Sequence, residues 1–160
     1  MTLQFRRALP HDHDVVLALH RALYVTHRDA VMDPARADFY AYTDLDSALS
    51  EDVTSLLTSD EAVVLLAERG GRVVGYISGR VVEDARRVLP RRGIVEDWLV
   101  LDGERGRGVG RALMDMVTRV FREAGCSAIE SATWPFNDGA RRAHEGLGFT
   151  EYEIRYRKKL

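Results

Sequence analysis

Long apolar runs and paired cysteines are missing from this sequence of 160 residues, and each absence excludes a class of protein. The longest uninterrupted apolar runs are short, as in Ala62–Ala67, so none can span a membrane. The first residues lack the apolar centre of a secretory signal peptide. Cys126 is the only cysteine, so no disulfide forms within the chain. These features suit a protein of the reducing cytoplasm that has no membrane partner.

Linkers and a strong net charge are absent as well. No Pro-, Gly- or Ser-rich stretch divides the chain, so a single domain over residues 1–160 is expected. The formal net charge of −2 argues against a general nucleic-acid binder. Acidic residues nevertheless outnumber basic ones in the first 66 positions, by eleven to five arginines. Basic residues outnumber acidic ones in the rest of the chain. Such asymmetry suits one half that binds a cation and another that binds an anion.

Hydrophobic periodicity predicts strands and helices that alternate along much of the chain. We expect strands at Leu3–Ala8, Ala62–Glu68, Val73–Glu83, Gly93–Leu101, Ala128–Thr133 and Phe149–Lys159. We expect helices that begin near Asp12 or Asp14 and at Asp44, one that runs to about Gly125, and a short one over Asn137–Gly146. Gly70-Gly71 is typical of a hairpin turn. This order predicts a mixed sheet covered by helices, an α/β or α+β fold.

Closely spaced glycines follow the strand that ends near Leu101, and they open the strongest helix of the sequence. Gly106, Gly108 and Gly110 lie among the basic residues Arg105, Arg107 and Arg111. The first turn of a helix has unpaired N–H groups and the positive end of the helix dipole. Glycines let a phosphate approach that backbone closely. The turn is therefore interpreted as a pyrophosphate cradle.

Two common phosphate loops fit this turn poorly. A P-loop needs a lysine, and none is present here. A dinucleotide-binding fingerprint needs a third glycine, but Arg111 stands in that position. Glu130 does lie 20 residues beyond Gly110, where a ribose-binding acid would be placed. The Gly-Gly hairpin argues against a dehydrogenase-like fold, because that fold begins with a βαβ unit of parallel strands.

The pattern that fits is Arg-x-x-Gly-x-Gly, formed by Arg105, Gly108 and Gly110 after a strand. Here the sequence resembles the GNAT superfamily of N-acetyltransferases. The preceding acidic strand, Glu96 to Val100, and the later Asn137-x-x-Ala140 with Leu147-Gly148-Phe149 are similar to two further signatures of that family. The resemblance extends along essentially the whole chain. It implies a mostly antiparallel central sheet that is splayed at the cofactor site, with helices on both faces.

The resemblance implies that acetyl-CoA is the acetyl donor. The turn would hold the pyrophosphate, and the strand before it would bind the pantetheine arm through its backbone. An N–H group near Leu99 or Val100 would face the thioester oxygen and stabilise the negative charge that develops there. The residues expected to contact the cofactor are Trp98, Leu99, Val100, Arg105, Gly106, Arg107, Gly108, Val109, Gly110, Arg111 and Asn137. Asn137 is equally suited to capping its helix.

The reaction needs a base, because an alkylamine with a pKa of roughly 10 is charged at neutral pH. Glu96 is the candidate for this role, and Asp97 points to the opposite face if the strand is regular. A bulge in the strand would make Asp97 the rival. His144 occupies the position, seven residues after Asn137, where many relatives carry a tyrosine that protonates the thiolate. His144 is either that proton donor or a core residue on the apolar face of its helix.

The acceptor is expected to be a primary amine, carried by a small molecule or a peptide. In similar proteins the first two helices and their loop line the acceptor site, and this stretch is acidic here. These acids either form a rim that attracts a cation, such as a polyamine, an aminoglycoside or a lysine side chain, or are solvated faces of the helices. The alternative is a coenzyme A or nucleotide sensor of the same fold without turnover. The histidines lack metal-ligand spacing, so no metal is expected. A homodimer is compatible with the sequence.

Overall fold

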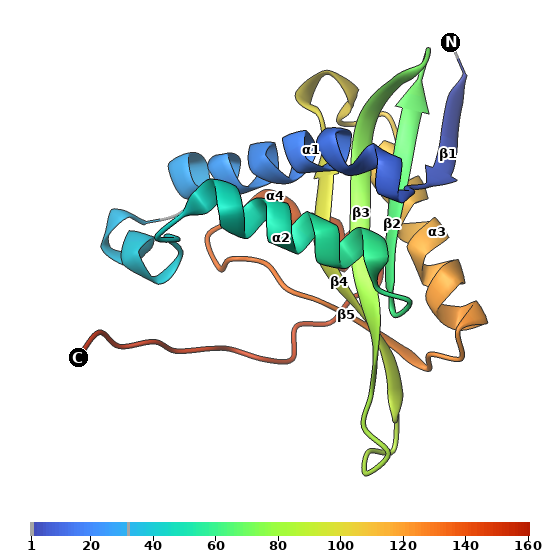
Figure 1. Ribbon diagram of the computed structural model, residues 1–160. Helices are drawn as coiled ribbons and strands as arrows, with labels where there is room; N and C mark the ends of the chain where they lie inside the picture. The colour runs from blue at the N-terminus through green and yellow to red at the C-terminus, as the bar shows by residue number, and fades with distance from the viewer. Residues whose placement is uncertain (1, 32) are drawn as a thin grey trace.

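The computed structural model describes residues 2–31 and 33–160 (Figure 1). Its main elements are β1 (Leu3–Arg7), α1 (His13–Thr26), α2 (Leu45–Thr58), β2 (Ala62–Arg69), β3 (Arg72–Glu83), β4 (Arg91–Val100), α3 (Val109–Glu123), β5 (Ala128–Ser131) and α4 (Asp138–Gly146). Between α1 and α2 the chain forms a π-helical turn (His27–Val31) and a 3₁₀ turn (Pro34–Phe39). No helix in the described ranges is long and apolar enough to cross a membrane.

The five strands form one sheet in the order β1-β2-β3-β4-β5. The first four strands pair in antiparallel fashion, and β5 pairs with β4 in parallel. The Gly-Gly turn joins β2 to β3, as predicted, with positive φ angles of 60° at Gly70 and 77° at Gly71. The expected mixed, mostly antiparallel sheet is confirmed.

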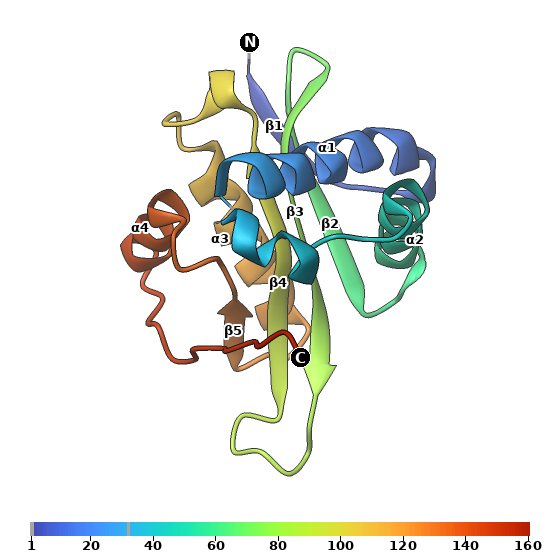
Figure 2. The same cartoon turned by 90° about the vertical axis from the view of Figure 1, so that its left-hand side faces the viewer.

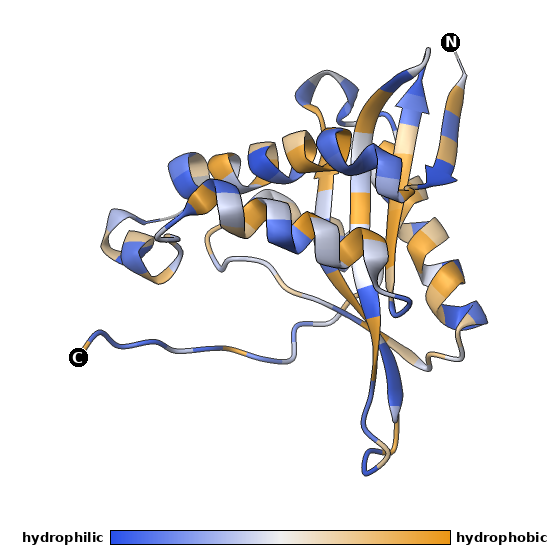
Figure 3. Cartoon of the chain, viewed as in Figure 1, coloured by the Kyte–Doolittle hydropathy of each residue, from blue (hydrophilic) through white to orange (hydrophobic). Residues whose placement is uncertain are grey.

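The helices cover both faces of this sheet, so its central strands are buried on two sides (Figures 1 and 2). Alternate residues of β2 serve two separate cores. Ala62, Val64 and Leu66 pack with α1 and α2, whereas Val63, Leu65 and Ala67 pack with α3. Figure 3 accordingly shows β2 as largely hydrophobic along its length. A continuous apolar run is what a strand covered on both faces requires.

Two strand glycines make room for an aromatic ring of α3. A Cβ atom added at Gly93 would lie 2.2 Å from a carbon of the Phe121 ring, and one added at Gly79 would lie 2.8 Å from the same ring. The Phe121 side chain is almost fully buried against this part of the sheet. The close approach of α3 to β3 and β4 therefore depends on these glycines.

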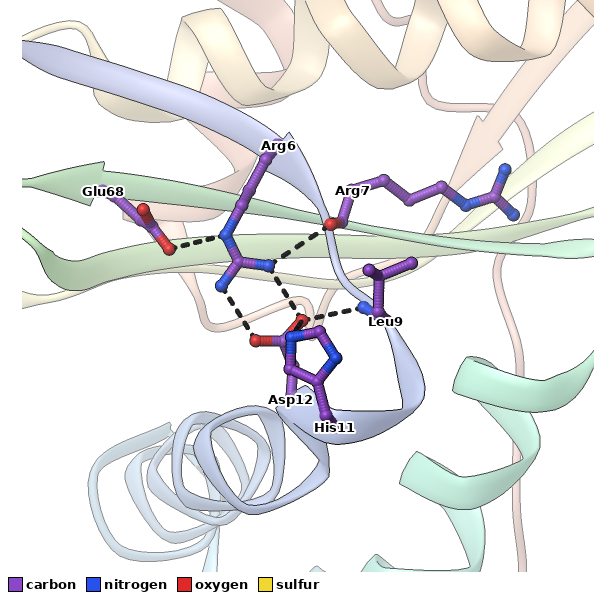
Figure 4. Close-up of polar contacts among 6 residues, drawn as sticks. All are labelled: Arg6, Arg7, Leu9, His11, Asp12 and Glu68. Carbon is purple, nitrogen blue, oxygen red and sulfur yellow. Dashed lines mark hydrogen bonds and ion pairs between the residues drawn. The ribbon is translucent and has the colours of Figure 1, made fainter.

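A buried carboxylate joins β1 to the start of α1 (Figure 4). Arg6 donates to both carboxylate oxygens of Asp12 at 2.8 Å, and its Nε donates to Glu68 at 2.8 Å. Asp12 also accepts from the backbone N–H of Leu9. The Arg6 guanidinium, outweighing the effect of burial, lowers the pKa of Asp12 to about 2. The expected helix start near Asp12 is thus confirmed, but the Asp12 side chain binds Arg6 instead of capping α1.

One expected strand does not form. Residues Phe149–Lys159 lie in no strand or helix, and the alternating Tyr152, Ile154 and Tyr156 are exposed. The segment crosses the molecule instead, where Arg157 donates to the carbonyl oxygen of Phe39 at 3.0 Å and Lys159 pairs with Asp38. An alternating pattern predicts a strand only where a partner edge is available. β5, four residues long, does not provide that edge to this segment.

Candidate active site

The sheet opens where β4 extends beyond the end of β5, the strand that pairs with it in parallel. β5 pairs with β4 only from Arg92 to Val95, while β4 continues to Val100. In the described residues, no strand pairs with this side of β4 from Glu96 onward. The splay expected from the sequence is therefore present, and its free backbone groups lie between the acidic residues of β4 and the glycine-rich turn.

A β-bulge sits at the start of this free stretch. Ser78 of β3 pairs with Asp97, but the next residue, Gly79, pairs with Val95. Glu96 is thus the extra residue on β4, and the usual alternation of side chains is interrupted there. The sequence left a regular strand and a bulge open, and the structure has the bulge, so Asp97 does not face away from Glu96. Both carboxylates line the same cavity.

Asp97 lies deep in the site. Its side chain is 13% exposed, and its Oδ2 accepts a hydrogen bond of 2.6 Å from the Ser78 hydroxyl. Its Oδ1 lies 3.4 Å from Nδ1 of His20, on α1. No arginine or lysine in the described residues forms an ion pair with Asp97. This carboxylate is available to a cation that enters the cavity.

Glu96 is more exposed and is already paired. Arg80 of β3 donates from Nε to Glu96 Oε1 at 2.6 Å, and the two side chains are about one third exposed. One carboxylate oxygen of Glu96 is therefore already occupied by a cation of the chain, whereas the carboxylate of Asp97 is not. The geometry therefore distinguishes the two acids that the sequence left as rivals.

A cavity of about 460 Å³ lies between α1, α2 and the free part of β4. Three carboxylates line it, those of Asp52, Glu96 and Asp97, and so does an aromatic wall. Within this wall Tyr24 stacks on Tyr40, with ring centroids 4.7 Å apart. The other aromatic members of the wall are Tyr42, which packs against Tyr24, and Trp134, whose ring meets Tyr40 edge to face. Such a cavity suits a cation with an apolar body.

The glycine-rich turn forms a second cavity of about 360 Å³. Gly106 and Gly108 have φ angles of 74° and 80°, and Gly108 is the N-cap residue immediately before α3. A Cβ atom at either of these glycines would meet no atom within 4 Å, so the space above their backbone is open. Left-handed glycines ahead of a helix expose N–H groups to an anion, as the sequence predicts. Trp98 lines both cavities and joins them.

The arginines near this turn have different roles. Arg105 turns back and donates to the carbonyl oxygen of Val100 at 3.0 Å, while Arg107 lies 3.8 Å from Glu104. Arg111 donates to the carbonyl oxygen of Gly146 at 3.1 Å and so ties α3 to α4. Arg105 and Arg111 line the cavity, together with Arg142, which the sequence analysis did not include.

His144 lies at the fork between β4 and β5. Its Nδ1 is 2.7 Å from the carbonyl oxygen of Ala140, and its Nε2 is 2.7 Å from the Ser131 hydroxyl. A carbonyl only accepts, so Nδ1 carries a proton, and in the neutral ring Nε2 accepts from Ser131. The ring meets Trp98 edge to face at 5.6 Å. Asn137 caps α4 by accepting from the N–H of Ala140, and its side chain reaches the rim of the first cavity.

Two groups of residues in the site were missed by the sequence analysis. His20 was considered only as a metal ligand, and the aromatic wall of Tyr24, Tyr40 and Tyr42 was not assigned. A signal for His20 is its place on α1 beside Leu19 and one turn after Val16, both of which are buried. A histidine at the edge of a buried stripe requires polar partners. Among the described residues, no cluster of three His, Cys, Asp or Glu side chains is arranged to hold a metal ion.

Known proteins with similar sequences share this architecture. The profile of the Acetyltransferase (GNAT) family matches residues 20–149. The chain is 33% identical over 114 residues to aminoglycoside N(6')-acetyltransferase type 1 of Stenotrophomonas maltophilia, covering 70% of this chain and 74% of the relative. It is 30% identical over 118 residues to the protein of the same name in Salmonella typhimurium, covering 71% and 81%. The fold matches that of aminoglycoside N-acetyltransferase AAC(6')-Iy in complex with CoA, with a TM-score of 0.78, 24% identity, and 99% and 96% of the two chains covered.

Proposed function

Because this chain belongs to the Acetyltransferase (GNAT) family and is an acetyl-CoA-dependent N-acetyltransferase, we propose that its acceptor is an aminoglycoside-type amino sugar. The observation that carries this proposal is the first cavity, in which the carboxylates of Asp52, Glu96 and Asp97 face an aromatic wall. Carboxylates attract ammonium groups, and aromatic faces pack against the apolar side of a sugar ring. We also propose that residues 1–160 form one N-acetyltransferase domain.

The two curated relatives support the same acceptor. Both are named for acetylation at the 6' nitrogen of aminoglycosides. An amino sugar with a primary 6' amine would place that amine at Asp97 and leave its further ammonium groups to Asp52 and Glu96, nearer the rim. The side chains of Asp52 and Asp97 are 51% and 13% exposed, so the carboxylates form a path of increasing depth.

The donor would enter from the second cavity. The N–H groups from Gly106 to Arg111 are proposed to bind the pyrophosphate of acetyl-CoA, and the free edge of β4 to bind its pantetheine arm. This places the thioester beside Leu99 and Val100 and within reach of an amine at Asp97. The amine attacks the thioester carbon directly, and a fixed backbone N–H stabilises the oxyanion that forms.

Asp97 is proposed as the group that takes the proton from the acceptor. It lies deeper than Glu96 and has no arginine partner, whereas Glu96 is neutralised by Arg80. The Ser78 hydrogen bond fixes its carboxylate toward the cavity. The role of Glu96 as the base stays a prediction from the sequence, and the two variants compared in the Discussion decide between them.

The proposed acceptor is tested with a panel of amines and acetyl-CoA, with release of the CoA thiol as the readout. The panel contains aminoglycosides with a 6' amine, matched aminoglycosides with a 6' hydroxyl, spermidine and a lysine peptide. We expect kcat/KM to be highest for the 6' amines and to fall by about 10³-fold or more for the 6' hydroxyl compounds, which lack the attacking group. Preference for spermidine or the peptide would contradict the proposal.

His144 is proposed to protonate the departing thiolate through Nε2. Its protonated form is then the active one, so the rate with saturating substrates should fall as the pH rises through the pKa of His144 in the complex. We expect His144→Phe to remove this alkaline limb and His144→Tyr to move it to higher pH, because a phenol has a higher pKa than an imidazole. The measurement is the pH–rate profile of the three proteins.

A core role for His144 gives a different result. His144→Phe would then change the midpoint of thermal unfolding, since the Ala140 and Ser131 hydrogen bonds are lost, but would leave the shape of the profile unchanged. Three superimposable profiles would therefore exclude proton transfer by His144.

A homodimer also stays a prediction. The C-terminal segment supports it, since Tyr152, Ile154 and Tyr156 alternate with charged residues and are 67% to 88% exposed. Exposed apolar side chains that lie close together in the sequence suit burial against another chain.

A further inference from the structure

The first cavity, proposed to bind the acceptor, is called the acceptor cavity below. In the described structure, His20 is the one histidine that lies between two of its carboxylates. Its Nδ1 lies 3.4 Å from Asp97 Oδ1, and its Nε2 lies 3.8 Å from Asp52 Oδ2. The side chain is 12% exposed. Asp97 comes from β4, His20 from α1 and Asp52 from α2, so three elements converge on this line of groups.

The hydrogen bonding of the ring is incomplete. Nδ1 lies 3.1 Å from the hydroxyl of Tyr76, which is fully buried on β3. Nε2 is buried and has no hydrogen-bond partner. Buried ring nitrogens are normally satisfied, so this arrangement has the features of a group that changes its protonation during function.

We propose that His20 stores the proton of the transfer reaction: it receives from Asp97 the proton that the acceptor ammonium loses, and holds it as an imidazolium between Asp97 and Asp52. This inference rests on the proposed function. In this proposal His20 acts through Asp97, so it is a positioning residue and not the catalytic base.

The proton balance is simple. The acceptor ammonium first loses one proton to a carboxylate oxygen of Asp97, which frees the nitrogen lone pair that attacks the thioester carbon. Asp97 passes this proton to Nδ1 of neutral His20 and becomes a carboxylate again. As the C–S bond breaks, the thiolate takes a proton from His144 and leaves as the CoA thiol, and the second proton that the nitrogen loses restores His144 through solvent. After the products depart, the imidazolium of His20 loses its proton to water by way of Asp97. No oxidant or further reactant is involved.

General acid–base chemistry explains why an imidazole is useful here. A carboxylic acid ordinarily has a pKa of about 4 and an alkylammonium a pKa of roughly 10, so the first is a poor sink for the proton of the second. An imidazole, with a pKa of about 6.5, lies between the two. Burial disfavours the imidazolium of His20, but the contact with Asp97 and the charge of Asp52 outweigh burial and raise the pKa of His20.

The titratable groups that face the ring are Asp97, Asp52 and Tyr76, from three different elements. Neutral His20 is the form that accepts a proton, so the rate with saturating substrates should fall as the pH falls through the raised pKa of His20. This acid limb is opposite in direction to the alkaline limb expected from His144, and the two are measured on the same curve.

The test is the pH–rate profile of His20→Gln, which keeps hydrogen-bonding atoms but does not titrate. We expect kcat to fall on the order of tenfold to a hundredfold at neutral pH and the acid limb to disappear. His27→Gln is the matched control. His27 lines the same cavity just past the end of α1, and its ring nitrogen contacts the Tyr40 hydroxyl at 3.4 Å instead of a carboxylate. The control should keep the limb.

A second variant separates proton storage from a structural role. His20→Ala leaves space for free imidazole, and we expect added imidazole to restore kcat while leaving the affinity for coenzyme A, measured by calorimetry, unchanged. NMR titration of His20 should give a lower pKa in the Asp97→Asn variant than in the parent protein, since both proteins keep His20. This readout does not depend on turnover or on the stability of the His20 variants.

Failure of the inference is distinct from failure of the proposed function. A parent protein that acetylates no amine of the panel would overturn the proposed function. An active parent whose acid limb persists in His20→Gln, or a His20→Ala variant that imidazole does not rescue, would overturn the proton store alone.

Discussion

Substitution of Asp97 by asparagine is expected to lower the rate of acetyl transfer at neutral pH by about 10²–10⁴-fold, the range typical for loss of a general base. Asparagine keeps the shape of the side chain and still accepts the Ser78 hydrogen bond, but its amide takes up no proton. The affinity for acetyl-CoA should be nearly unchanged, because Asp97 lines only the acceptor cavity. Steady-state kinetics with a 6' amine, together with calorimetry of coenzyme A, measures both quantities.

Glu96→Gln is the matched variant for this experiment, since the two acids are adjacent on β4 and line one cavity. We expect its rate to fall by less than about tenfold, because Glu96 is neutralised by Arg80 before the acceptor binds. A larger loss in Glu96→Gln than in Asp97→Asn would reverse the two roles and restore the assignment that a regular strand predicts.

Introduction of a negative charge at Gly108 should weaken coenzyme A binding on the order of a hundredfold, the effect of losing one charge-assisted contact of about 1.5–3 kcal/mol. Gly108 is the N-cap residue of α3 with a φ angle of 80°, and the space above it is open. In Gly108→Asp a carboxylate would therefore occupy the place proposed for the pyrophosphate. Calorimetric titration with coenzyme A is the measurement.

Gly108→Asn isolates the charge in this experiment. Asparagine has the size of aspartate, tolerates a left-handed backbone and is also a good helix cap, so both variants share the cost in backbone conformation. We expect Gly108→Asn to bind coenzyme A within about tenfold of the parent, since it adds bulk without repulsion. Equal affinities for the Asp and Asn variants would place the pyrophosphate elsewhere.

The glycine-rich turn was predictable because its information is local. The positive φ angles of Gly106 and Gly108 and the start of α3 depend on a few consecutive residues. The Gly70-Gly71 hairpin was predictable for the same reason, and so was the helix start at Asp44, which accepts from the N–H of Ser47. The burial of the sheet on both faces also follows from the uninterrupted apolar run Ala62–Ala67 of β2.

The bulge at Glu96 could not be read from β4 alone. It is a property of the register between two strands, because Ser78 and Gly79 of β3 determine which residue of β4 is left unpaired. The contacts of His20 with Asp52 and Asp97 could not be predicted for a similar reason, since they depend on how α1 packs against α2 and β4. The strand expected at Phe149–Lys159 failed because alternation describes one segment, whereas a strand needs a second one.

The path of the C-terminal segment matters for how the protein is handled in the laboratory. Arg157 donates to the carbonyl oxygen of Phe39, and Lys159 pairs with Asp38. Tyr40, which follows Phe39, stacks on Tyr24 in the wall of the acceptor cavity. Affinity tags or fusion partners joined beyond Leu160 are therefore connected mechanically to the acceptor site. Figures 1 and 2 show β1 far from the end of the C-terminal segment. A tag placed before β1 therefore avoids that connection. Kinetic constants for different acceptors are best compared on protein whose C-terminal residues are unmodified.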